Sequence, residues 1–143
     1  MRVSSPSFEH NGRLPRKHTC DGEDVSPALE IAELPAATVS LAIINDDPDA
    51  PVGTWVHWVE YDIPPTATIA EGAKGLGIHG TNSWGVQGFR GACPPSGTHR
   101  YFFKVYALDA RLGLAAGARK EQLLLAMEGH VLEQAETIGL YSR

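Results

Sequence analysis

Short apolar segments separated by turn-forming residues dominate the hydropathy pattern of the chain. Residues 38–44 are β-branched and apolar, which predicts a buried strand. Residues 55–63 predict a second strand, whose period of two places four side chains on one face: Trp55, His57, Val59 and Tyr61. Glu60 and Asp62 alternate with them, so they are expected to face water. Residues 100–109 are aromatic and apolar and predict the strongest strand of the chain.

One amphipathic helix is predicted near the C-terminal end, over residues 119–137. Its apolar stripe recurs at three- and four-residue spacing: Leu124, Met127, Val131, Ala135 and Ile138. Gly139 predicts the end of this helix, and Gly129 inside it costs about 1 kcal/mol relative to Ala. Several short strands with one late helix favour an all-β fold, a β-sandwich carrying a C-terminal helix. No repeat or linker interrupts the pattern, so residues 1–143 predict a single domain.

Glycine and proline are concentrated in two segments of the chain. Together they number 25 of 143 residues, where average usage gives about 17. Residues 45–53 hold three Asp, two Pro and one Gly, which predicts an ordered loop. Residues 72–97 hold eight of the fifteen glycines, interleaved with aromatic residues and prolines. Long structured loops in a domain of this size usually carry function, so both segments are candidate site regions.

The formal net charge is −5, and no Lys or Arg lies between Lys17 and Lys74. An acidic balance disfavours binding to nucleic acid and to anionic membrane surfaces, because both need a basic face. The most apolar stretch, residues 34–44, is too short to cross a bilayer. The N-terminal residues lack the apolar core of a signal peptide. A soluble cytoplasmic protein without an integral membrane segment is therefore predicted.

The two cysteines, Cys20 and Cys93, leave two alternatives open. A single Cys20–Cys93 bridge is possible, but free thiols in a reducing compartment are favoured, because two cysteines do not make a disulfide framework. A catalytic thiol at Cys93 is a weaker alternative to a small buried residue.

Two clusters of residues could carry chemistry. Residues 46–51 read Asp-Asp-Pro-Asp-Ala-Pro and residues 94–101 read Pro-Pro-Ser-Gly-Thr-His-Arg-Tyr. Alone, the first could be a turn in which Asp caps the backbone, and the second a histidine lining the core. Together with His57 they predict a two-walled site at the ends of strands. The histidine spacing matches no zinc motif, and neither a serine-hydrolase elbow nor a nucleotide-binding glycine loop occurs.

At these clusters the chain resembles the phosphatidylethanolamine-binding protein family. The likeness is to its bacterial and archaeal branch, often called Raf-kinase-inhibitor-like proteins. It rests on residues 19–27, 46–51, 53–58, 91–101, 106–109, 129–132 and 140–143. The resemblance implies two antiparallel sheets with Greek-key connections and an anion pocket at one end. It also implies a cis bond between Ala50 and Pro51.

The resemblance assigns eleven residues to that pocket. The candidate ligand-binding residues are Asp47, Asp49, Pro51, Trp55, His57, Gly91, Cys93, Pro94, Pro95, His99 and Tyr101. Ring nitrogens, the tyrosine hydroxyl and loop amides would supply hydrogen bonds to an anion. Asp47 would either fix the tautomer of a histidine or meet the ammonium end of a zwitterion.

These residues predict a non-enzymatic binding protein for phosphate, carboxylate or phosphoethanolamine-like head groups. No catalytic residue, metal or cofactor is expected. A kinase-like or other protein partner and a homodimer, with Trp84 as a candidate contact, are further expectations. Two alternatives stay open: a small hydrolase using His57, His99 and Asp47, and a structural homodimer with a vestigial pocket.

Overall fold

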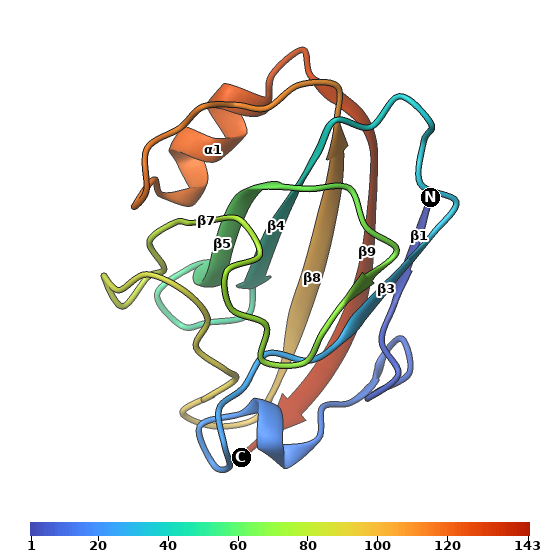
Figure 1. Ribbon diagram of the computed structural model, residues 1–143. Helices are drawn as coiled ribbons and strands as arrows, with labels where there is room; N and C mark the ends of the chain where they lie inside the picture. Colours follow the sequence, from blue (N-terminus) through green and yellow to red (C-terminus); the bar gives the residue numbers. More distant parts are fainter.

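The computed structural model describes residues 1–143, which form two packed β-sheets and one short α-helix (Figure 1). The smaller sheet has the order β1-β3-β6. Its strands are β1 (Arg2–Ser4), β3 (Leu29–Ala32) and β6 (Thr68–Ile69). The larger sheet has the order β2-β9-β8-β4-β5-β7. Its strands are β2 (Gly12–Arg13), β4 (Ser40–Asp47), β5 (Trp55–Ile63), β7 (Ile78–His79), β8 (Thr98–Leu108) and β9 (Val131–Ser142).

The larger sheet contains a Greek key, as the family resemblance implied. Within this sheet β4, β5 and β7 are successive antiparallel neighbours, and β8 returns to lie beside β4. One pair departs from the antiparallel expectation, because β2 runs parallel to β9. The two helical elements are the 3₁₀ turn η1 (Arg16–His18) and the helix α1 (Lys120–Met127).

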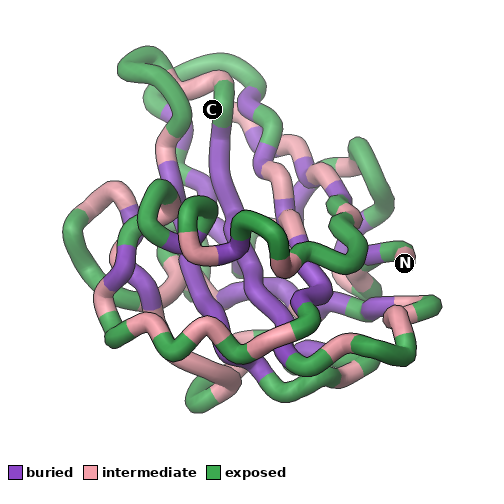
Figure 2. The backbone as a smooth tube through the Cα atoms, turned by 90° about the horizontal axis from the view of Figure 1, so that it is seen from above, coloured by how far each residue is buried: buried purple, intermediate pink, exposed green.

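Apolar side chains cover both faces of the larger sheet. The core between the sheets includes Trp58 and Phe103, and a second core on the opposite face includes Tyr61, Leu123 and Met127. All eight residues of β4 are buried, which explains why residues 41–44 within it form a continuous apolar run. Figure 2 shows the buried positions following the long central strands, with exposed positions gathered in the connections.

The predicted exposure of Glu60 and Asp62 is wrong, because both carboxylates are buried. Glu60 accepts hydrogen bonds from the Trp58 indole and the Gly77 amide, each at 3.0 Å. Asp62 accepts two backbone amides from residues 112–113, at 2.7 and 3.1 Å. Neighbouring loops cover this strand, and their amides replace the water that the alternation pattern had assigned to the two acids.

The predicted helix over residues 119–137 is also wrong in its second half. The chain leaves α1 through Gly129, which has φ of +79°, and continues as β9, paired with β8 along its length. Val131 and Ala135 are four residues apart, a spacing that satisfies both the helical period of 3.6 and the strand period of 2. Gly139, expected to end the helix, lies inside β9.

Candidate functional site

A cavity of about 250 Å³ opens where β4, β5 and the segment leading into β8 meet. The loop after β4 forms one side of it, and the two prolines before β8 form another. Twelve residues line this cavity: Asp47, Ala50, Pro51, Val52, Trp55, His57, Trp84, Cys93, Pro94, Pro95, His99 and Tyr101. The fold thus brings together residues that are up to 54 positions apart in the sequence, from Asp47 to Tyr101.

Nine of the eleven candidate residues line the cavity, and Asp49 and Gly91 do not. Asp49 instead accepts two bonds from the Arg100 guanidinium and one from its backbone amide, at 2.9 to 3.0 Å. These bonds lower the pKa of Asp49 to about 2 and fasten the loop after β4 to β8. Gly91 packs so tightly that a Cβ there would collide with the His18 carbonyl. Both residues therefore build the walls.

The carboxylate of Asp47 orients His99. His99 Nδ1 lies 2.6 Å from Asp47 Oδ2, and both side chains are buried. The second carboxylate oxygen accepts the backbone amide of Asp49 at 2.8 Å. Asp47 therefore has both oxygens engaged with the protein, and His99 donates from Nδ1 and presents Nε2 as its free ring nitrogen.

His57 is positioned by a β-bulge rather than by a charge. Val56 and Trp58 pair with adjacent residues of β4, so His57 is the extra residue between them, and such bulges re-aim a side chain. Its Nδ1 donates to the Arg90 carbonyl at 2.8 Å. Burial lowers the pKa of His57 below its ordinary value, more than the nearby carbonyl and carboxylates raise it. Neutral His57 with its proton on Nδ1 presents a lone pair on Nε2.

Tyr101 supplies a third polar atom, and burial raises its pKa, so the hydroxyl stays protonated. Its ring lies edge-on to His57 at 5.3 Å between centroids, and Trp84 contacts His57 in the same way at 5.0 Å. His57, His99 and Tyr101 all line the cavity. Their side chains are therefore the ones that can offer ring nitrogens and a hydroxyl to a ligand there.

Comparison with known proteins places this arrangement in a family. The family model for the phosphatidylethanolamine-binding protein matches residues 4–142. The chain belongs to the phosphatidylethanolamine-binding protein family. A UPF0098 protein from Methanothermobacter thermautotrophicus is 49% identical over the whole chain and 99% of the relative. A UPF0098 protein from Chlamydia muridarum is 41% identical, with the same coverage.

Two solved structures share the fold of this family member. A phosphatidylethanolamine-binding protein homologue from Chlamydia trachomatis superposes with a TM-score of 0.96, at 38% identity, covering 99% of the chain and 97% of that structure. YbcL from Escherichia coli, described as a member of the mammalian family, superposes with a TM-score of 0.91, at 28% identity, covering 99% and 98%. The resemblance inferred from the pocket motifs is thus confirmed.

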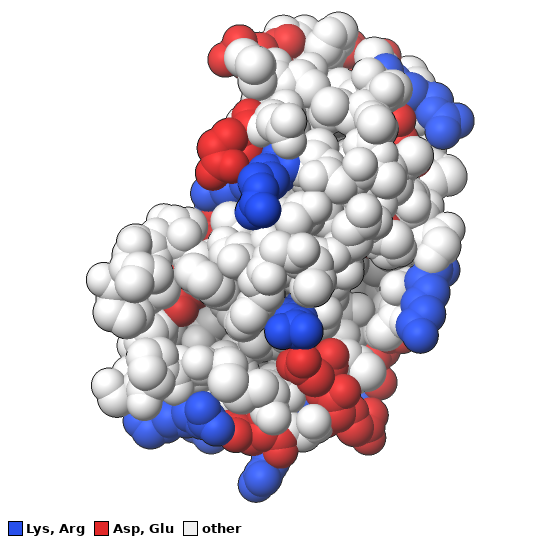
Figure 3. All heavy atoms as spheres, turned by 90° about the vertical axis from the view of Figure 1, so that its left-hand side faces the viewer, with Lys and Arg blue, Asp and Glu red and all other residues white.

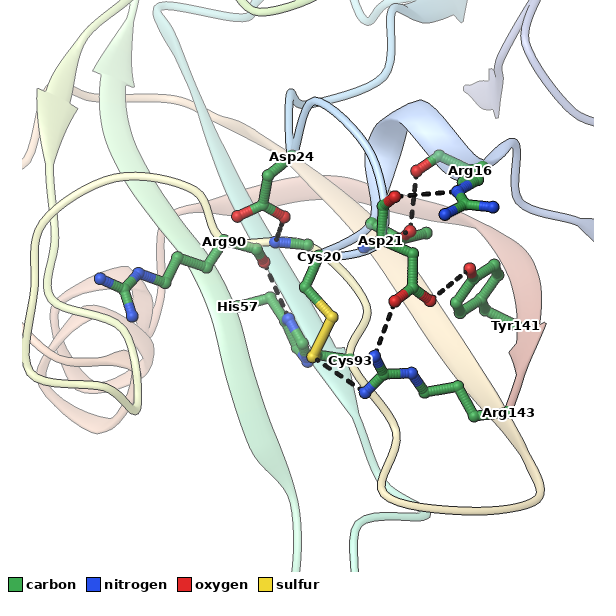
Figure 4. The surroundings of a disulfide bond; sticks show 11 residues. Arg16, Cys20, Asp21, Asp24, His57, Arg90, Cys93, Tyr141 and Arg143 are labelled. Carbon is green, nitrogen blue, oxygen red and sulfur yellow. Dashed lines mark hydrogen bonds and ion pairs between the residues drawn. A yellow bond between two sulfur atoms is a disulfide. The ribbon is translucent and has the colours of Figure 1, made fainter.

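The two cysteines of this family member form a disulfide, so the preference for free thiols is wrong (Figure 4). Cys20 and Cys93 have Cα atoms 5.4 Å apart, although they lie 73 residues apart in the sequence. The segment after η1 runs beside residues 91–93 and brings them together, a contact that cysteine spacing could not reveal. Cys93 is exposed at the cavity rather than buried. As a disulfide it has no thiol to act as a nucleophile.

Two further details of the pocket differ from expectation. The Ala50–Pro51 bond is trans, since the chain contains no cis peptide bond. Ala50, Val52 and Trp84 line the cavity without having been assigned to it. Trp84, a candidate dimer contact, is half-buried and packs edge-on against Trp55 at 5.5 Å. Its place in the glycine-rich segment, among other aromatic residues, was the available signal.

On the face shown in Figure 3, Lys and Arg side chains are scattered in small groups among neutral and acidic ones. No group of three or more His, Cys, Asp and Glu side chains lies close enough to hold a metal ion. None of the helices has the length and apolar character needed to cross a membrane.

Proposed function

We propose that the chain is a non-enzymatic binding protein whose cavity holds a small phosphate- or carboxylate-type group. The observation that carries this proposal is that three polar side chains able to bind an anion line one cavity: His57, His99 and Tyr101. They come from two different strands and meet in a site with few other polar groups. Convergent polar groups in a largely apolar cavity are typical of small-molecule sites.

The proton positions favour a phosphate that carries a hydrogen. Neutral His57 offers an acceptor at Nε2, because its Nδ1 proton is held by the Arg90 carbonyl. Tyr101 offers a donor. A phosphate monoester near neutral pH is partly protonated, since its second pKa is about 6. It therefore supplies both a P–O–H donor for His57 and oxygen acceptors for Tyr101, whereas an ionised carboxylate supplies acceptors only.

The rest of the cavity favours a ligand with an apolar portion beside the anion. Trp55, Trp84, Pro51, Pro94 and Pro95 all lie in the lining. A volume of about 250 Å³ is below the 300–1,000 Å³ typical of sites for drug-sized ligands. A head group such as phosphoethanolamine suits this size, and its ethylene carbons would lie against the apolar wall.

NMR titration of the labelled full chain tests this function. Inorganic phosphate and phosphoethanolamine are titrated at millimolar concentration, with chloride at the same ionic strength as the control. We expect shifts at the His57, His99 and Tyr101 side chains. His99→Ala should weaken phosphate binding about tenfold, the effect of losing about 1.4 kcal/mol of hydrogen bonding. His130→Ala is the matched control, because His130 also contacts an aspartate but lies outside the cavity.

The absence of shifts at all three side chains would contradict a phosphate site. A carboxylate such as acetate, titrated in the same way, separates the two anion classes. Stronger binding of acetate than of phosphate would overturn the preference for a protonated phosphate while keeping the cavity as an anion site.

A phosphorylated side chain of a partner protein presents the same chemical group. We therefore propose regulation of a kinase-like or other phosphorylated partner as a second use of the same cavity. A phosphoserine peptide that competes with free phosphate would support it, and failure to compete would restrict the site to small ligands.

A hydrolase is the second candidate, and one observation favours it. The contact of 2.6 Å between Asp47 and His99 is the geometry by which a carboxylate orients a general base. Turnover of p-nitrophenyl phosphate or p-nitrophenyl acetate, lost in both His57→Ala and His99→Ala, would support this candidate. Unchanged turnover in those variants would dismiss it.

Self-association and a cytoplasmic location stay predictions. Sedimentation velocity of the purified chain measures the first. A dimer that shows no phosphate shifts would favour the structural alternative with a vestigial pocket.

A further inference from the structure

The disulfide joins a surface loop to the wall of the cavity. Cys20 follows η1, and Cys93 begins the Cys-Pro-Pro segment that lines the cavity. Both cysteines are exposed. Exposed disulfides are open to attack by thiols, and they include the labile and regulatory ones. This bond therefore combines access for a reductant with a direct connection to the candidate binding site.

A single cation lies against one sulfur only. The Arg143 guanidinium is 3.6 Å from Cys93 Sγ and also bonds Asp21 at 2.6 Å (Figure 4). Its backbone is fixed in turn by two hydrogen bonds with Gly97, at 2.9 and 3.2 Å. No side chain makes a corresponding bond to Cys20 Sγ. A nearby arginine lowers the pKa of a thiol and so makes it the better leaving group.

We propose that Cys20–Cys93 is a thiol–disulfide exchange site whose reductant is a dithiol and whose state controls the wall of the cavity. One thiolate of the dithiol attacks Cys20 Sγ and forms a mixed disulfide. The Cys20–Cys93 bond breaks, and its electron pair leaves on Cys93 Sγ beside Arg143. The second thiol of the reagent then attacks its own bound sulfur and releases Cys20. The dithiol is oxidised to its disulfide, and its two protons go to the two cysteines.

Reduction should loosen the cavity wall, because few other contacts hold it to the loop. The Cys20 amide bonds the Ala92 carbonyl at 3.0 Å, and the Gly91 amide bonds Asp24 at 2.9 Å. Both bonds are made by residues 91 and 92, which precede Pro94 and Pro95 in the chain. After reduction no covalent bond would join the segment of these prolines to the loop after η1. An effect on ligand affinity rests on the proposed function, whereas the exchange chemistry does not.

The first experiment tests which sulfur is attacked. The oxidised full chain is treated briefly with glutathione, trapped with iodoacetamide and mapped by mass spectrometry. We expect glutathione on Cys20 and the alkyl group on Cys93. Reduction by dithiothreitol should be roughly threefold slower in Arg143→Gln, because the thiolate that leaves on Cys93 loses the cation beside it.

Tyr141→Phe is the matched control for the loop. It removes the other hydrogen bond to Asp21, at 2.7 Å, and leaves the contact between Arg143 and Cys93 intact. We expect its reduction rate to equal that of the wild type. Equal rates in all three proteins, or glutathione found on Cys93, would overturn the assignment. Two thiols that stay free after treatment with oxidised glutathione would overturn the site as a whole.

The second experiment tests the wall without requiring a known ligand. Amide hydrogen exchange of residues 91–97 is compared in the oxidised chain, the reduced chain and Cys20→Ser. We expect faster exchange in the last two, and several-fold weaker phosphate binding. Unchanged exchange would overturn the control of the wall. Faster exchange with no phosphate binding in either state would support this inference and contradict the proposed function, so the two can fail separately.

Discussion

The two histidines of the cavity are held by different kinds of partner. His57 donates to a backbone carbonyl on one wall, and His99 contacts the carboxylate of Asp47 on the other. A carbonyl fixes a tautomer but brings no net charge, and burial then keeps His57 neutral by lowering its pKa. The carboxylate brings a full negative charge to His99. Two residues of one type thus provide an uncharged acceptor on one side and a histidine oriented by an acid on the other.

The two walls of the cavity are also held in place by different kinds of contact. The His57 wall is a bulged strand buried on both faces, so its geometry comes from β-sheet pairing. The His99 wall is a loop-to-strand junction held by side-chain bonds from Asp47 and Asp49. We therefore expect single side-chain substitutions to damage the second wall more than the first.

The largest effect is expected from Asp47→Ala. It leaves His99 Nδ1 and the amide of Asp49 without their acceptor inside a buried site. Losing hydrogen bonds to a buried charged group should lower the free energy of unfolding by about 2–3 kcal/mol. Urea denaturation at neutral pH measures this change.

Asp109→Ala is the matched control for that substitution. Asp109 contacts His130 Nδ1 at 2.8 Å, the same pair of groups, but both side chains are 45% exposed. Exposed pairs of this kind are worth at most about 1 kcal/mol. If the two variants lost equal stability, burial of the Asp47–His99 contact would not be what makes it strong.

A smaller effect is expected on affinity when a ligand that carries a proton is compared with one that does not. With neutral His57 as acceptor, phosphate should bind about tenfold more tightly than sulfate near pH 7.5, because sulfate carries no proton there. As the pH falls below the ordinary histidine value, sulfate should gain affinity, since an anion favours the protonated ring. Calorimetric titration with both anions across this range measures the preference.

His57→Ala should abolish the preference for phosphate over sulfate, because it removes the acceptor. His79→Ala is the control, a histidine outside the cavity lining.

The lowered pKa of His57 also affects the stability of the fold. The unfolded chain takes up a proton near the ordinary value of 6.5 and the folded chain only at lower pH. The wild type should therefore lose stability as the pH falls below 6.5, and His57→Ala should lose less. If His57→Ala kept the preference for phosphate over sulfate, His57 would not be the acceptor for the ligand's proton.

Much of the fold could be predicted from local patterns. Strand β5 matches residues 55–63, because aromatic and β-branched alternation has only one structural interpretation at that length. Strand β9 was missed, because a four-residue spacing between Val131 and Ala135 fits both a helix and a strand. Only pairing with β8 decides between them, and that is a long-range contact.

The candidate site could likewise be predicted only in part. Nine of the candidate residues gather in one cavity, and they belong to motifs that are contiguous in sequence. Trp84 was not assigned to the cavity, and free thiols were preferred to a Cys20–Cys93 bridge, because both features depend on where the glycine-rich segment folds. Asp49 and Gly91 were assigned to the lining because they lie in those motifs. In the structure Asp49 bonds Arg100 and Gly91 packs against the His18 carbonyl, so both residues support the wall and do not line the cavity.

The smallest effect is expected from Asp49→Asn, which weakens the fastening of the His99 wall to Arg100. This ion pair is partly exposed, with 29% of the Asp49 side chain and 51% of the Arg100 side chain accessible, so we expect a loss of about 0.5–1 kcal/mol at pH 7. The folded pKa of about 2 lies below the ordinary value of 3.8. The contribution is therefore complete above about pH 4 and lost as the pH falls toward 2. Urea denaturation of both proteins at pH 7 and pH 3 should show the gap between them narrowing. A gap that stayed constant would mean that Asp49 acts through the shape of the turn, and the His99 wall would then depend on charge only at Asp47.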